Sequence, residues 1–486
     1  MSAHPSPDTV GPLPEKAFTS TRGGSASKRV VIVGAGISGL SAAYSLKKAG
    51  WEPFLIDSRP RAGGVLETTT VDHCLIEGGP DSYLAQKPWA SSLIAELGMA
   101  DDLIGSNDDR RKTFIVRRDR LVSMPDGLMM MVPTKVLPML RTPLLGWPTK
   151  LRMGLDLFRG KPRGIRDGDV SVAEFFRDHY GQEAVDYLAE PLLAGVYGGD
   201  PARMSANCVL GRFVELERKY GSLSRGVLKE RRHGKPARGS SLFRTLKHGM
   251  GSLADKLVDV IGKEHFHLNS AAEVLERTAD GYSVRVAGER IHARNVILAT
   301  PAYGAGALLG GLAPEAATLL CEIPYTSSAT VALIFDPASF AKPLDGFGFL
   351  VPRLERKTLV AATYVQNKFS YRVPDNKVLL RCFVGSAAEE DPRLRDDEAL
   401  FDAVRSDLKR LIGLDHAPLA HRIFRWNRAM AQYEVGHTRR VNEIIERTEK
   451  LPGIHLAGNA YEGIGIPDCV RSGQKAAAAC IARGAN

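Results

Sequence analysis

The apolar positions near the start of the chain predict a strand, a helix and a second strand in close succession. Val30 to Val33 are four consecutive apolar residues, a pattern typical of a strand buried on both faces. A helical pattern then runs from Leu40 to Ala49 and stops at Gly50. Phe54 to Ile56 are again apolar and predict the second strand. The spacing therefore predicts a β-α-β unit.

The turn between this strand and this helix carries a glycine motif. The motif is G-x-G-x-x-G, formed by Gly34, Ala35, Gly36, Ile37, Ser38 and Gly39. Its glycines allow a tight turn, a close approach of backbone to a pyrophosphate, and close packing of helix on strand. The first N–H groups of the helix would bind phosphate. Asp57 ends the second strand, where a carboxylate accepts ribose hydroxyls. The unit therefore predicts a dinucleotide site.

The C-terminal residues repeat this order of elements. An apolar run at Ile454 to Ala457 leads into a glycine-rich turn and then into a helical pattern from Val470 to Arg483. A helix whose amino end points at a flavin ring would stabilise negative charge on it, and a nicotinamide enzyme has no need of this second turn. Arg59, Arg61 and the pair Gly63-Gly64 also resemble FAD proteins of the amine-oxidase type.

Several segments resemble the oxygen-dependent porphyrinogen oxidases, also called protoporphyrinogen oxidases, which are FAD enzymes of haem biosynthesis in the amine-oxidase superfamily. The resemblance extends from about Arg29 to the end of the chain. The segments that carry it are Gly78 to Ser82, Gly195 to Asp200, Gly346 to Pro352, Gln432 to His437, Tyr461 to Gly463, and Asp468 with Cys469.

The resemblance implies a mixed α/β fold of the amine-oxidase type. Its discontinuous Rossmann-type FAD-binding domain would take residues 29–97, 246–302 and 453–486, and the middle piece is predicted as strands with turns. A sheet-based substrate domain would take 112–122 and 304–450, and a helical, basic lobe 123–230. Residues 1–28 are rich in Pro, Ser, Thr and Gly and predict a disordered tail.

The resemblance also implies the reaction. It is the FAD-dependent oxidation of protoporphyrinogen IX to protoporphyrin IX, in which a methylene bridge gives a hydride to flavin N5 and O2 accepts the electrons as H2O2. Coproporphyrinogen III, oxidised to coproporphyrin III, is the alternative substrate, and a flavin amine oxidase is a third reading. Because the pyrrole nitrogens lose the protons, we expect apolar side chains that hold a flat ring rather than a side-chain base.

The residues expected at the two sites follow from the same motifs. The FAD contacts would be Gly34, Ala35, Gly36, Ile37, Ser38, Gly39, Asp57, Ser58, Arg61, Gly64, Val65, Gly79, Pro80, Asp81, Ser82, Val274, Asn459, Ile464, Gly465 and Ile466. The substrate contacts would be Gly195, Phe347, Leu350, Phe383, Met430, Arg111 and Lys112. Many relatives carry a propionate-binding Arg where this chain has Thr113, so Arg111 and Lys112 are the candidates to replace it. FAD is expected to be non-covalent, because porphyrinogen oxidases also carry a cysteine at the position of Cys469 without attachment.

The positive charge is concentrated in one segment. The chain carries +10, and residues Arg110 to Arg166 hold fourteen Lys or Arg against three acids. Apolar runs at Leu128 to Val132 and Leu144 to Trp147 lie among these charges. The combination favours a peripheral contact with anionic lipid headgroups, or an amphipathic anionic ligand, over nucleic acid. A homodimer and the next haem-pathway enzyme are further candidate partners.

The remaining composition points to the cytoplasm. No apolar run reaches the roughly 18 residues of a membrane-spanning helix. The six cysteines form no C-x-x-C pair, which favours free thiols in a reducing compartment, and the histidines lack metal-site spacing. We therefore expect a cytoplasmic protein, with any membrane contact at the inner face of the cell membrane.

Overall fold

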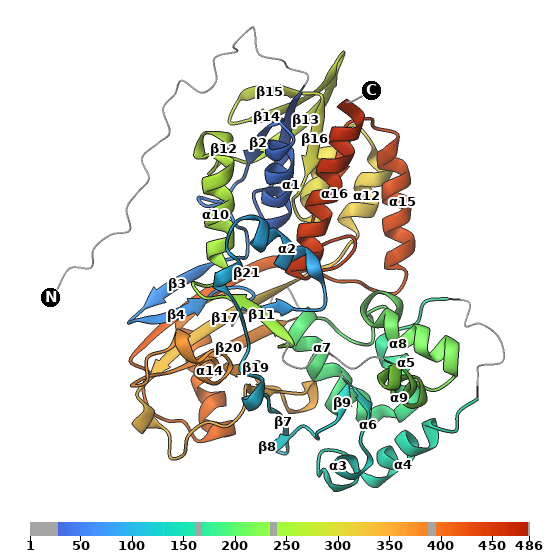
Figure 1. Ribbon diagram of the computed structural model, residues 1–486, viewed down its shortest axis with the longest axis vertical. Coiled ribbons are helices and arrows are strands. Elements are labelled where there is room, and N and C mark those ends of the chain that lie inside the picture. The colour runs from blue at the N-terminus through green and yellow to red at the C-terminus, as the bar shows by residue number, and fades with distance from the viewer. Residues whose placement is uncertain (1–27, 130, 161–167, 234–240, 387–394, 485–486) are drawn as a thin grey trace, which may run out of the picture.

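The computed structural model describes residues 28–129, 131–160, 168–233, 241–386 and 395–484. They form three parts (Figure 1): a layered part around a parallel sheet, a part around a seven-stranded sheet, and a lobe of helices. The predicted disordered tail, up to residue 27, lies outside the described residues, and so do Lys161, Arg163 and Arg166 of the predicted basic lobe.

Five parallel strands form the centre of the first part. They are β1 (Arg29–Val33), β2 (Glu52–Ile56), β12 (Phe266–His267), β16 (Asn295–Leu298) and β22 (Ile454–Leu456). Their order is β12-β2-β1-β16-β22, so strands from the beginning, middle and end of the chain lie side by side. Alternate residues of β1 face opposite ways: Val30 and Ile32 belong to one hydrophobic core, and Val31 and Val33 to another.

Helices pack on one face of this sheet and mainly a small sheet on the other (Figure 1). The first core joins β1 to α1 (Ile37–Lys48), α2 (Pro88–Glu96), α10 (Gly251–Ile261) and α16 (Ile466–Gly484). The second core joins it to β13 (Ala272–Thr278), β14 (Gly281–Val286), β15 (Glu289–Ala293), α11 (Ala302–Leu309), α12 (Pro314–Cys321) and α15 (His437–Glu449).

The second part is a mostly antiparallel sheet. Its strands are β7 (Thr113–Arg117), β8 (Arg120–Ser123), β17 (Tyr325–Phe335), β18 (Gly348–Leu350), β19 (Leu359–Tyr364), β20 (Val378–Ser386) and β21 (Ala420–Ala431). Their order is β21-β17-β20-β19-β18-β7-β8. One face packs on α14 (Asp397–Ile412), where Val404 and Leu408 share a core with Val331 and Cys382. The other face turns toward the first part and carries the contacts described below.

The third part is a lobe of helices at the lower right of Figure 1. It contains α3 (Val136–Arg141), α4 (Trp147–Asp156), α5 (Val172–Tyr180), α6 (Gln182–Ala184), α7 (Glu190–Tyr197), α8 (Ala206–Tyr220) and α9 (Leu223–His233). A capping box of Ser171 and Glu174 begins α5, with both reciprocal hydrogen bonds present.

A buried histidine joins three of these helices. His179 of α5 lies 2.6 Å from an Asp156 oxygen through Nδ1 and 3.2 Å from a Glu217 oxygen through Nε2. The Asp156 carboxylate also accepts hydrogen bonds from the Ser222 hydroxyl and the Ser224 N–H. The buried polar groups of α4, α5 and α8 therefore satisfy one another inside an apolar core.

Short elements join the three parts. A hairpin of β3 (Thr68–Val71) and β4 (Cys74–Glu77) packs on the seven-stranded sheet. The remaining elements are β5 (Tyr83–Leu84), β6 (Leu103–Gly105), β9 (Leu128–Met129), β10 (Val132–Pro133), β11 (Phe243–Leu246) and α13 (Val365–Lys368). No helix in the described ranges combines the length and apolar content needed to cross a bilayer.

The elements differ from the sequence prediction at a few points. Helix α1 begins three residues before the predicted Leu40, and α16 begins four residues before Val470, because glycine-rich turns hide the start of each helix. The middle piece, predicted as strands with turns, also contains α10, whose apolar residues Leu253, Leu257 and Ile261 recur at helical spacing.

Candidate active site

The first glycine turn follows β1. Gly34 has a φ of +108° and donates its N–H to the Ile56 carbonyl at 2.7 Å. A Cβ on Gly34 would come within 2.5 Å of the Ala299 oxygen, and one on Gly39 within 1.9 Å of the Gly34 oxygen. A Cβ on Gly36 would meet nothing within 4 Å, so open space lies beside the glycine where a pyrophosphate is expected.

Asp57 braces this turn from the end of β2. Its Oδ2 accepts the Ala35 N–H at 2.7 Å, and its Oδ1 accepts the Arg59 N–H at 2.9 Å. Ile37 and Ser38 form the first turn of α1, where backbone N–H groups have no helical acceptor and can hold phosphate. The acid and the helix end therefore meet at one turn, as the motif spacing predicts.

The loop after Asp57 lies beside the first turn. A Cβ on Gly64 would come within 3.1 Å of the Gly36 Cα atom, while Ser58 is exposed and Val65 half-buried. Arg61, expected to contact FAD, donates from Nη2 to the Gly64 carbonyl at 2.8 Å. It also donates to the Ala62 and Leu66 carbonyls and to the Glu67 carboxylate, so its visible role is to shape this loop.

The segment Gly79-Pro80-Asp81-Ser82 packs against that loop. A Cβ on Gly79 would come within 2.0 Å of the Val65 oxygen. Asp81 accepts from Lys368 Nζ at 2.8 and 3.0 Å and pairs with Arg381 at 3.1 Å. Burial alone would raise the pKa of Asp81, but Lys368 and Arg381 outweigh it and hold that pKa well below its usual range.

Val274 lies on the far side of the parallel sheet, in β13. It pairs with Arg285, and the register shifts between Ala272 and Val274. The chain just before β13 contacts the end of β2, because the Ser270 N–H donates to the Asp57 carbonyl at 2.9 Å. Val274 therefore follows, four residues later in the chain, the residue that contacts Asp57 of the predicted dinucleotide site. It lies at an irregular point of β13.

The second glycine turn follows β22. Gly458 has a φ of +134°, and its N–H donates to the Ser472 hydroxyl at 3.1 Å. The Asn459 amide donates to the Ala429 carbonyl at 3.0 Å. The Tyr433 hydroxyl donates to the Asn459 carbonyl at 2.7 Å and accepts the Gly463 N–H at 2.8 Å. The seven-stranded sheet and the segment after it therefore hold this turn.

Ile464, Gly465 and Ile466 lead into α16. The Cys469 N–H donates to the Gly465 carbonyl at 2.9 Å, and the Cys469 thiol lies 3.8 Å from the Ile464 carbonyl. Burial raises the pKa of Cys469 to about 12, so this sulfur stays a thiol.

Two buried hydroxyls in the neighbourhood of the glycine turns fit a bound dinucleotide. Thr300 follows β16 between Gly34 and Gly458, since its backbone lies within 4 Å of a Cβ built on either glycine. Its Oγ1 and the hydroxyl of Tyr461 are buried without a hydrogen-bond partner among the described residues. Such atoms are rare in folded proteins, and a bound polar ligand would satisfy them.

The predicted substrate residues share one face of the seven-stranded sheet. Leu350 of β18 lies opposite Ala361 of β19, which lies opposite Phe383 of β20 and then Thr330 of β17. Opposite residues of neighbouring strands lie on the same face, so Leu350 and Phe383 flank a small alanine. Arg381, two residues before Phe383, shares this face, with its guanidinium 5.0 Å from the Phe383 ring.

Helix α7 brings Gly195 to this face. A Cβ on Gly195 would lie 3.3 Å from Leu350 Cδ2. Met430 of β21 is near the end of the same helix, since a Cβ on Gly198 would lie 3.4 Å from its sulfur. Gln432 donates to the carbonyls of Tyr197 and Met430 at 2.8 and 3.1 Å.

The other predicted substrate residues lie just before the paired strands β7 and β18 begin. The Phe347 N–H donates to the Lys112 carbonyl at 2.8 Å, and the Phe347 side chain is buried. The Lys112 ammonium pairs with Asp345 at 2.7 Å and lies over the Phe114 ring. Arg111 is exposed beside it. Both cations therefore lie just before β7, and the Phe114 ring beneath the Lys112 ammonium packs on the α14 side of the sheet, opposite the face of Leu350.

Sequence reasoning missed Lys368, Arg381 and Trp426, and it named Gln432 only within a family segment, without a role at the site. Arg381 had the clearest signal, a single charge inside the apolar strand Val378 to Val384. The other three lie far in sequence from the segments that they contact, so their roles require the three-dimensional arrangement.

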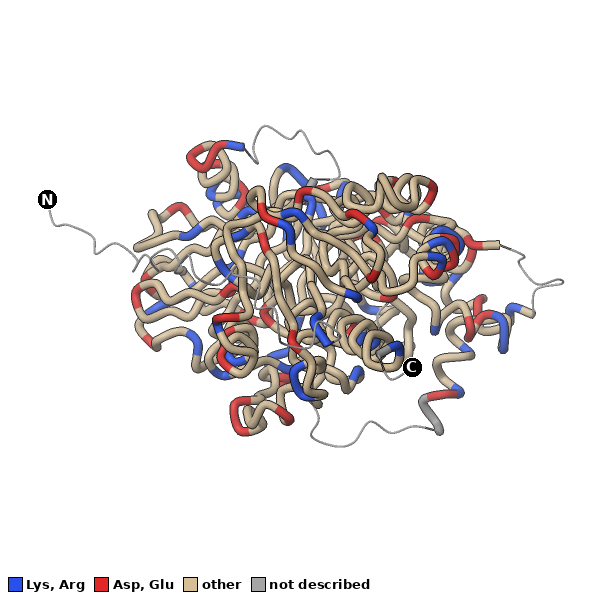
Figure 2. The backbone as a smooth tube through the Cα atoms, turned by 90° about the horizontal axis from the view of Figure 1, so that it is seen from above, with Lys and Arg blue, Asp and Glu red and all other residues tan. Residues whose placement is uncertain are grey.

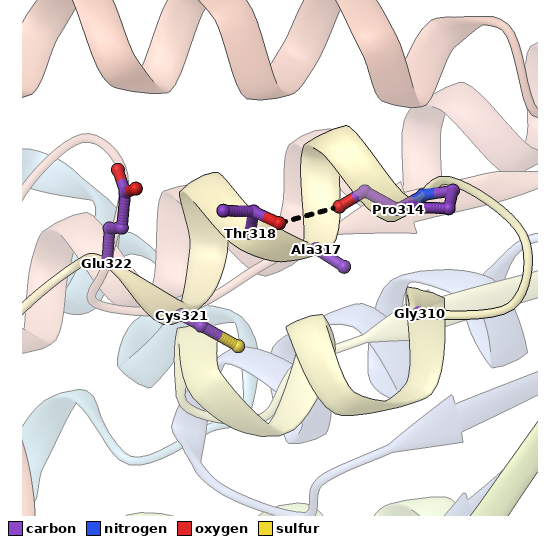
Figure 3. A pocket seen from close by; sticks show the side chains of 6 residues that line it. All are labelled: Gly310, Pro314, Ala317, Thr318, Cys321 and Glu322. Carbon is purple, nitrogen blue, oxygen red and sulfur yellow. Dashed lines mark hydrogen bonds between the residues drawn. The ribbon is translucent and has the colours of Figure 1, made fainter.

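Two surface hollows lie away from these residues. One, between α11 and α12, is lined by Gly310, Pro314, Ala317, Thr318, Cys321 and Glu322 (Figure 3). The Thr318 hydroxyl there donates to the Pro314 carbonyl of its own helix at 3.0 Å. The other is lined by residues of β13 and α11, including Val274. No other predicted site residue lines either hollow, and no cluster in the described residues could hold a metal ion.

Comparison with known proteins identifies the family. The model of the flavin containing amine oxidoreductases matches residues 37–481. The chain is 32% identical to a coproporphyrinogen III oxidase of Bacillus subtilis, over 92% of this chain and 97% of that protein. It is 26% identical to protoporphyrinogen oxidase 2 of Arabidopsis thaliana, over 93% of each chain.

A solved structure assigned as a protoporphyrinogen oxidase, from Exiguobacterium sp. 255-15, superposes with a TM-score of 0.83. It is 32% identical and covers 93% of this chain and 98% of that chain. The predicted amine-oxidase-like α/β fold, the FAD cofactor and the oxidoreductase class are thereby confirmed. The chain belongs to the flavin containing amine oxidoreductase family and resembles the porphyrinogen oxidases within it.

Proposed function

We propose that the chain oxidises a porphyrinogen to the corresponding porphyrin, with coproporphyrinogen III as the preferred substrate, O2 as the oxidant and H2O2 as the second product. The observation that supports this most directly is the apolar row Leu350, Ala361 and Phe383. It lies on the sheet face from which Arg381 contacts the segment Gly79 to Ser82, expected beside the flavin. A flat macrocycle laid on that row would lie next to the flavin segment.

The protein's own contribution is to orient the porphyrinogen ring and to exclude water from it. Phe383 and Leu350 present apolar surface, and the missing side chain at Gly195 leaves room over Leu350. The chemistry supplied by FAD, when bound, would be acceptance of a hydride from a methylene bridge and transfer of the electrons to O2. Each round removes one hydride from a bridge and one proton. Over three rounds two of the protons come from pyrrole nitrogens and one from the fourth bridge, so one porphyrinogen and three O2 give one porphyrin and three H2O2. Orientation of this kind lowers the barrier by fixing the reacting atoms in advance.

The preference for coproporphyrinogen III rests on the relatives. Three bacterial relatives named coproporphyrinogen III oxidase are 30–32% identical, against 26–27% for the plant protoporphyrinogen oxidases. Coproporphyrinogen carries four propionates, and the exposed Arg111 offers positive charge close to Thr113, which stands in place of an Arg. Protoporphyrinogen IX, predicted first from the resemblance, is the second candidate, supported by the assignment of the Exiguobacterium structure.

The test is porphyrin fluorescence in air, with coproporphyrinogen III and protoporphyrinogen IX supplied separately to the purified yellow protein. We expect a higher kcat/KM for the first. A higher value for the second would transfer the proposal to protoporphyrinogen IX. If neither rate exceeds the autoxidation blank, porphyrinogen oxidation is overturned, and turnover of primary amines measured as peroxide release would support the amine-oxidase reading instead.

We further propose that α3 and α4 contact an anionic membrane surface. Both helices expose large apolar side chains, with 68% of Trp147 and 82% of Phe158, which follows α4, accessible to solvent. Trp147, Leu151 and Leu155 recur every four residues and so lie along one side of α4. The remaining exposed apolar residues of this surface are Val136, Leu137 and Leu140.

Basic side chains accompany this apolar surface. The Lys150 ammonium lies 4.9 Å from the Trp147 ring centre, and Lys135, Arg141 and Arg152 belong to the same two helices or their ends. Elsewhere Lys and Arg are interspersed with Asp and Glu along the chain (Figure 2). A surface that combines Trp, Leu and Lys suits the interface of an anionic bilayer.

Vesicle sedimentation tests this contact. We expect binding to phosphatidylglycerol vesicles, weaker binding to phosphatidylcholine vesicles, and loss of binding in a Trp147→Ser/Leu151→Ser variant. Leu419→Ser, which removes an exposed leucine outside the helical lobe, is the matched control. Equal sedimentation of the double variant and the control would overturn the proposal.

A further inference from the structure

Three side chains from the seven-stranded sheet and its connections hold the segment Gly78 to Ser82. The Trp426 indole N–H of β21 donates to the Gly78 carbonyl at 2.9 Å. Arg381 of β20 donates to the Gly79 carbonyl at 2.5 Å. Lys368, the last residue of α13, binds both Asp81 oxygens and lies 3.1 Å from the Ser82 hydroxyl. Backbone and side chains of this segment are therefore fixed by the opposite domain.

The contacts are buried and charged. Arg381 is 2% exposed, and the side chains of Lys368 and Asp81 are each 12% exposed. A second pair, Glu77 with Arg372 at 3.1 Å, is buried beside them. Charged groups withdrawn from water in this way hold a fixed geometry, because any movement would leave a buried charge without its partner.

The same strand serves both predicted sites. Arg381 and Phe383 are two residues apart on β20, so they point to the same face. Arg381 holds the segment expected beside the flavin, and Phe383 is expected to form the wall that the substrate meets. A displacement of β20 would consequently reach both sites together.

The packing around Gly78 and Gly79 leaves the segment little room to relax. A Cβ on Gly78 would come within 2.5 Å of the Phe424 ring, and one on Gly79 within 2.0 Å of the Val65 oxygen. The segment is thus pressed between the loop after Asp57 and the sheet face. Its position depends on the side chains that hold it there.

We propose that Arg381, together with Lys368 and Trp426, is a positioning residue that sets the placement of the flavin-side segment Gly78 to Ser82 from the substrate sheet. The inference rests on the proposed function only in taking this segment as part of the FAD site. It assigns to the substrate domain a part in FAD binding that acts through this segment. The test measures properties of the bound flavin, so its outcome does not depend on which porphyrinogen is oxidised.

The test compares Arg381→Met, Arg381→Lys and Trp426→Phe as purified holoproteins. Flavin release on dilution gives the FAD dissociation constant, and dye equilibration gives the flavin midpoint potential. Lys377→Met is the matched control, because Lys377 also joins the sheet to the β3–β4 hairpin, through Asp72 at 2.5 Å, but outside the held segment. Removal of the Arg381 contacts is expected to weaken FAD binding about tenfold or more, the typical effect of one or two charge-assisted hydrogen bonds.

We expect weaker FAD binding and a shifted flavin spectrum in Arg381→Met. Both properties should recover in part in Arg381→Lys and should be those of the wild type in Lys377→Met. Trp426→Phe keeps an aromatic ring at this position but removes the five-membered part of the indole with its N–H, so a smaller shift in the flavin spectrum is expected even if Arg381→Met fails to fold. Wild-type FAD affinity and spectrum in Arg381→Met, or in Trp426→Phe where the first variant is insoluble, would overturn the proposal. A loss in Lys377→Met equal to that in Arg381→Met would overturn it as well, since the effect would then be general.

Discussion

Gly473 of α16 lies directly against the backbone of Ser38 in α1. A Cβ built on Gly473 would come within 2.1 Å of the Ser38 carbonyl oxygen. Ser38 belongs to the first glycine turn, and α16 follows the second. Helix α16 therefore crosses α1 at the start of α1. The distance between the two glycine turns depends on the absence of a side chain at Gly473.

Replacement of Gly473 by Ala should weaken both folding and FAD binding, because the methyl group has no space unless the helices separate. We expect a loss of about 1–3 kcal/mol in the free energy of unfolding, as for overpacking elsewhere. Urea unfolding followed by flavin fluorescence measures it. Gly154→Ala in α4 is the control, since its Cβ meets nothing within 4 Å, and it should stabilise by up to about 1 kcal/mol.

Enlargement of Gly195 should raise KM for the porphyrinogen without releasing FAD. A Leu at this position would fill the space over Leu350 Cδ2, the atom nearest to the position of its Cβ. Steady-state fluorescence assays of Gly195→Ala and Gly195→Leu should show KM rising with side-chain volume. Gly211→Ala, in α8 with free space around it, is the control. An unchanged KM in Gly195→Leu would contradict the placement of substrate on this face.

Removal of the His179 ring should destabilise the helical lobe by about 3–5 kcal/mol, because Asp156 and Glu217 would lose a shared buried partner. Differential scanning calorimetry of His179→Ala should show an early transition while the flavin stays bound. The exposed His416→Ala should leave the trace unchanged. A single transition at the wild-type temperature in His179→Ala would contradict this role.

Acid should destabilise the fold through His437. Burial and the neighbouring Arg440 lower its pKa from 6.5 to about 4, although Asp169 acts in the opposite sense, and its ring stacks on Tyr433 at 4.1 Å. The unfolded state binds the proton more readily than the folded state. The stabilisation that neutral His437 gives to the fold is therefore full above pH 6.5 and is lost as the pH falls toward 4. The loss is on the order of 3 kcal/mol. Chemical denaturation of His437→Phe from pH 7 to pH 4.5 should show a flatter pH dependence than wild type, and parallel curves would refute the assignment.

The flavin should be released by acid precipitation. Cys469 is buried beside the second glycine turn, and its raised pKa of about 12 keeps it a thiol, which is a poor nucleophile for a covalent link. We expect the yellow colour in the supernatant after trichloroacetic acid treatment. Yellow colour that stays in the pellet, and leaves it in Cys469→Ala, would show an attachment.

The sequence predicted the parallel sheet well because its signals are local. The run Val30 to Val33, the glycines of the first turn and Asp57 lie within about thirty residues, and each is constrained by its own backbone geometry. The start of α16 was misjudged because Gly463 and Gly465 interrupt the helical pattern just before Ile466.

The contacts between the domains could not be predicted in the same way. Lys368 and Asp81 are 287 residues apart, and Trp426 and Gly78 are 348 residues apart, so no local periodicity connects them. Arg61 shows the converse case: its place in a familiar motif predicts a ligand contact, which stays a prediction, and the structure adds that its guanidinium is bonded to its own loop. Hydrogen bonds of a side chain to nearby carbonyls depend on rotamer and loop geometry, which a motif does not specify.

The strand order of the parallel sheet has a consequence for how the molecule assembles. Strand β22 pairs with β16, and α16 packs on α1, yet more than 150 residues separate β16 from β22 along the chain. During synthesis, α1 leaves the ribosome long before its partner helix exists, and the seven-stranded sheet has time to form in between. Contacts of such long sequence separation form slowly. Closure of the nucleotide-binding layer is therefore a late folding event, and a chain interrupted before residue 454 would leave β16 as the edge strand of the sheet in place of β22.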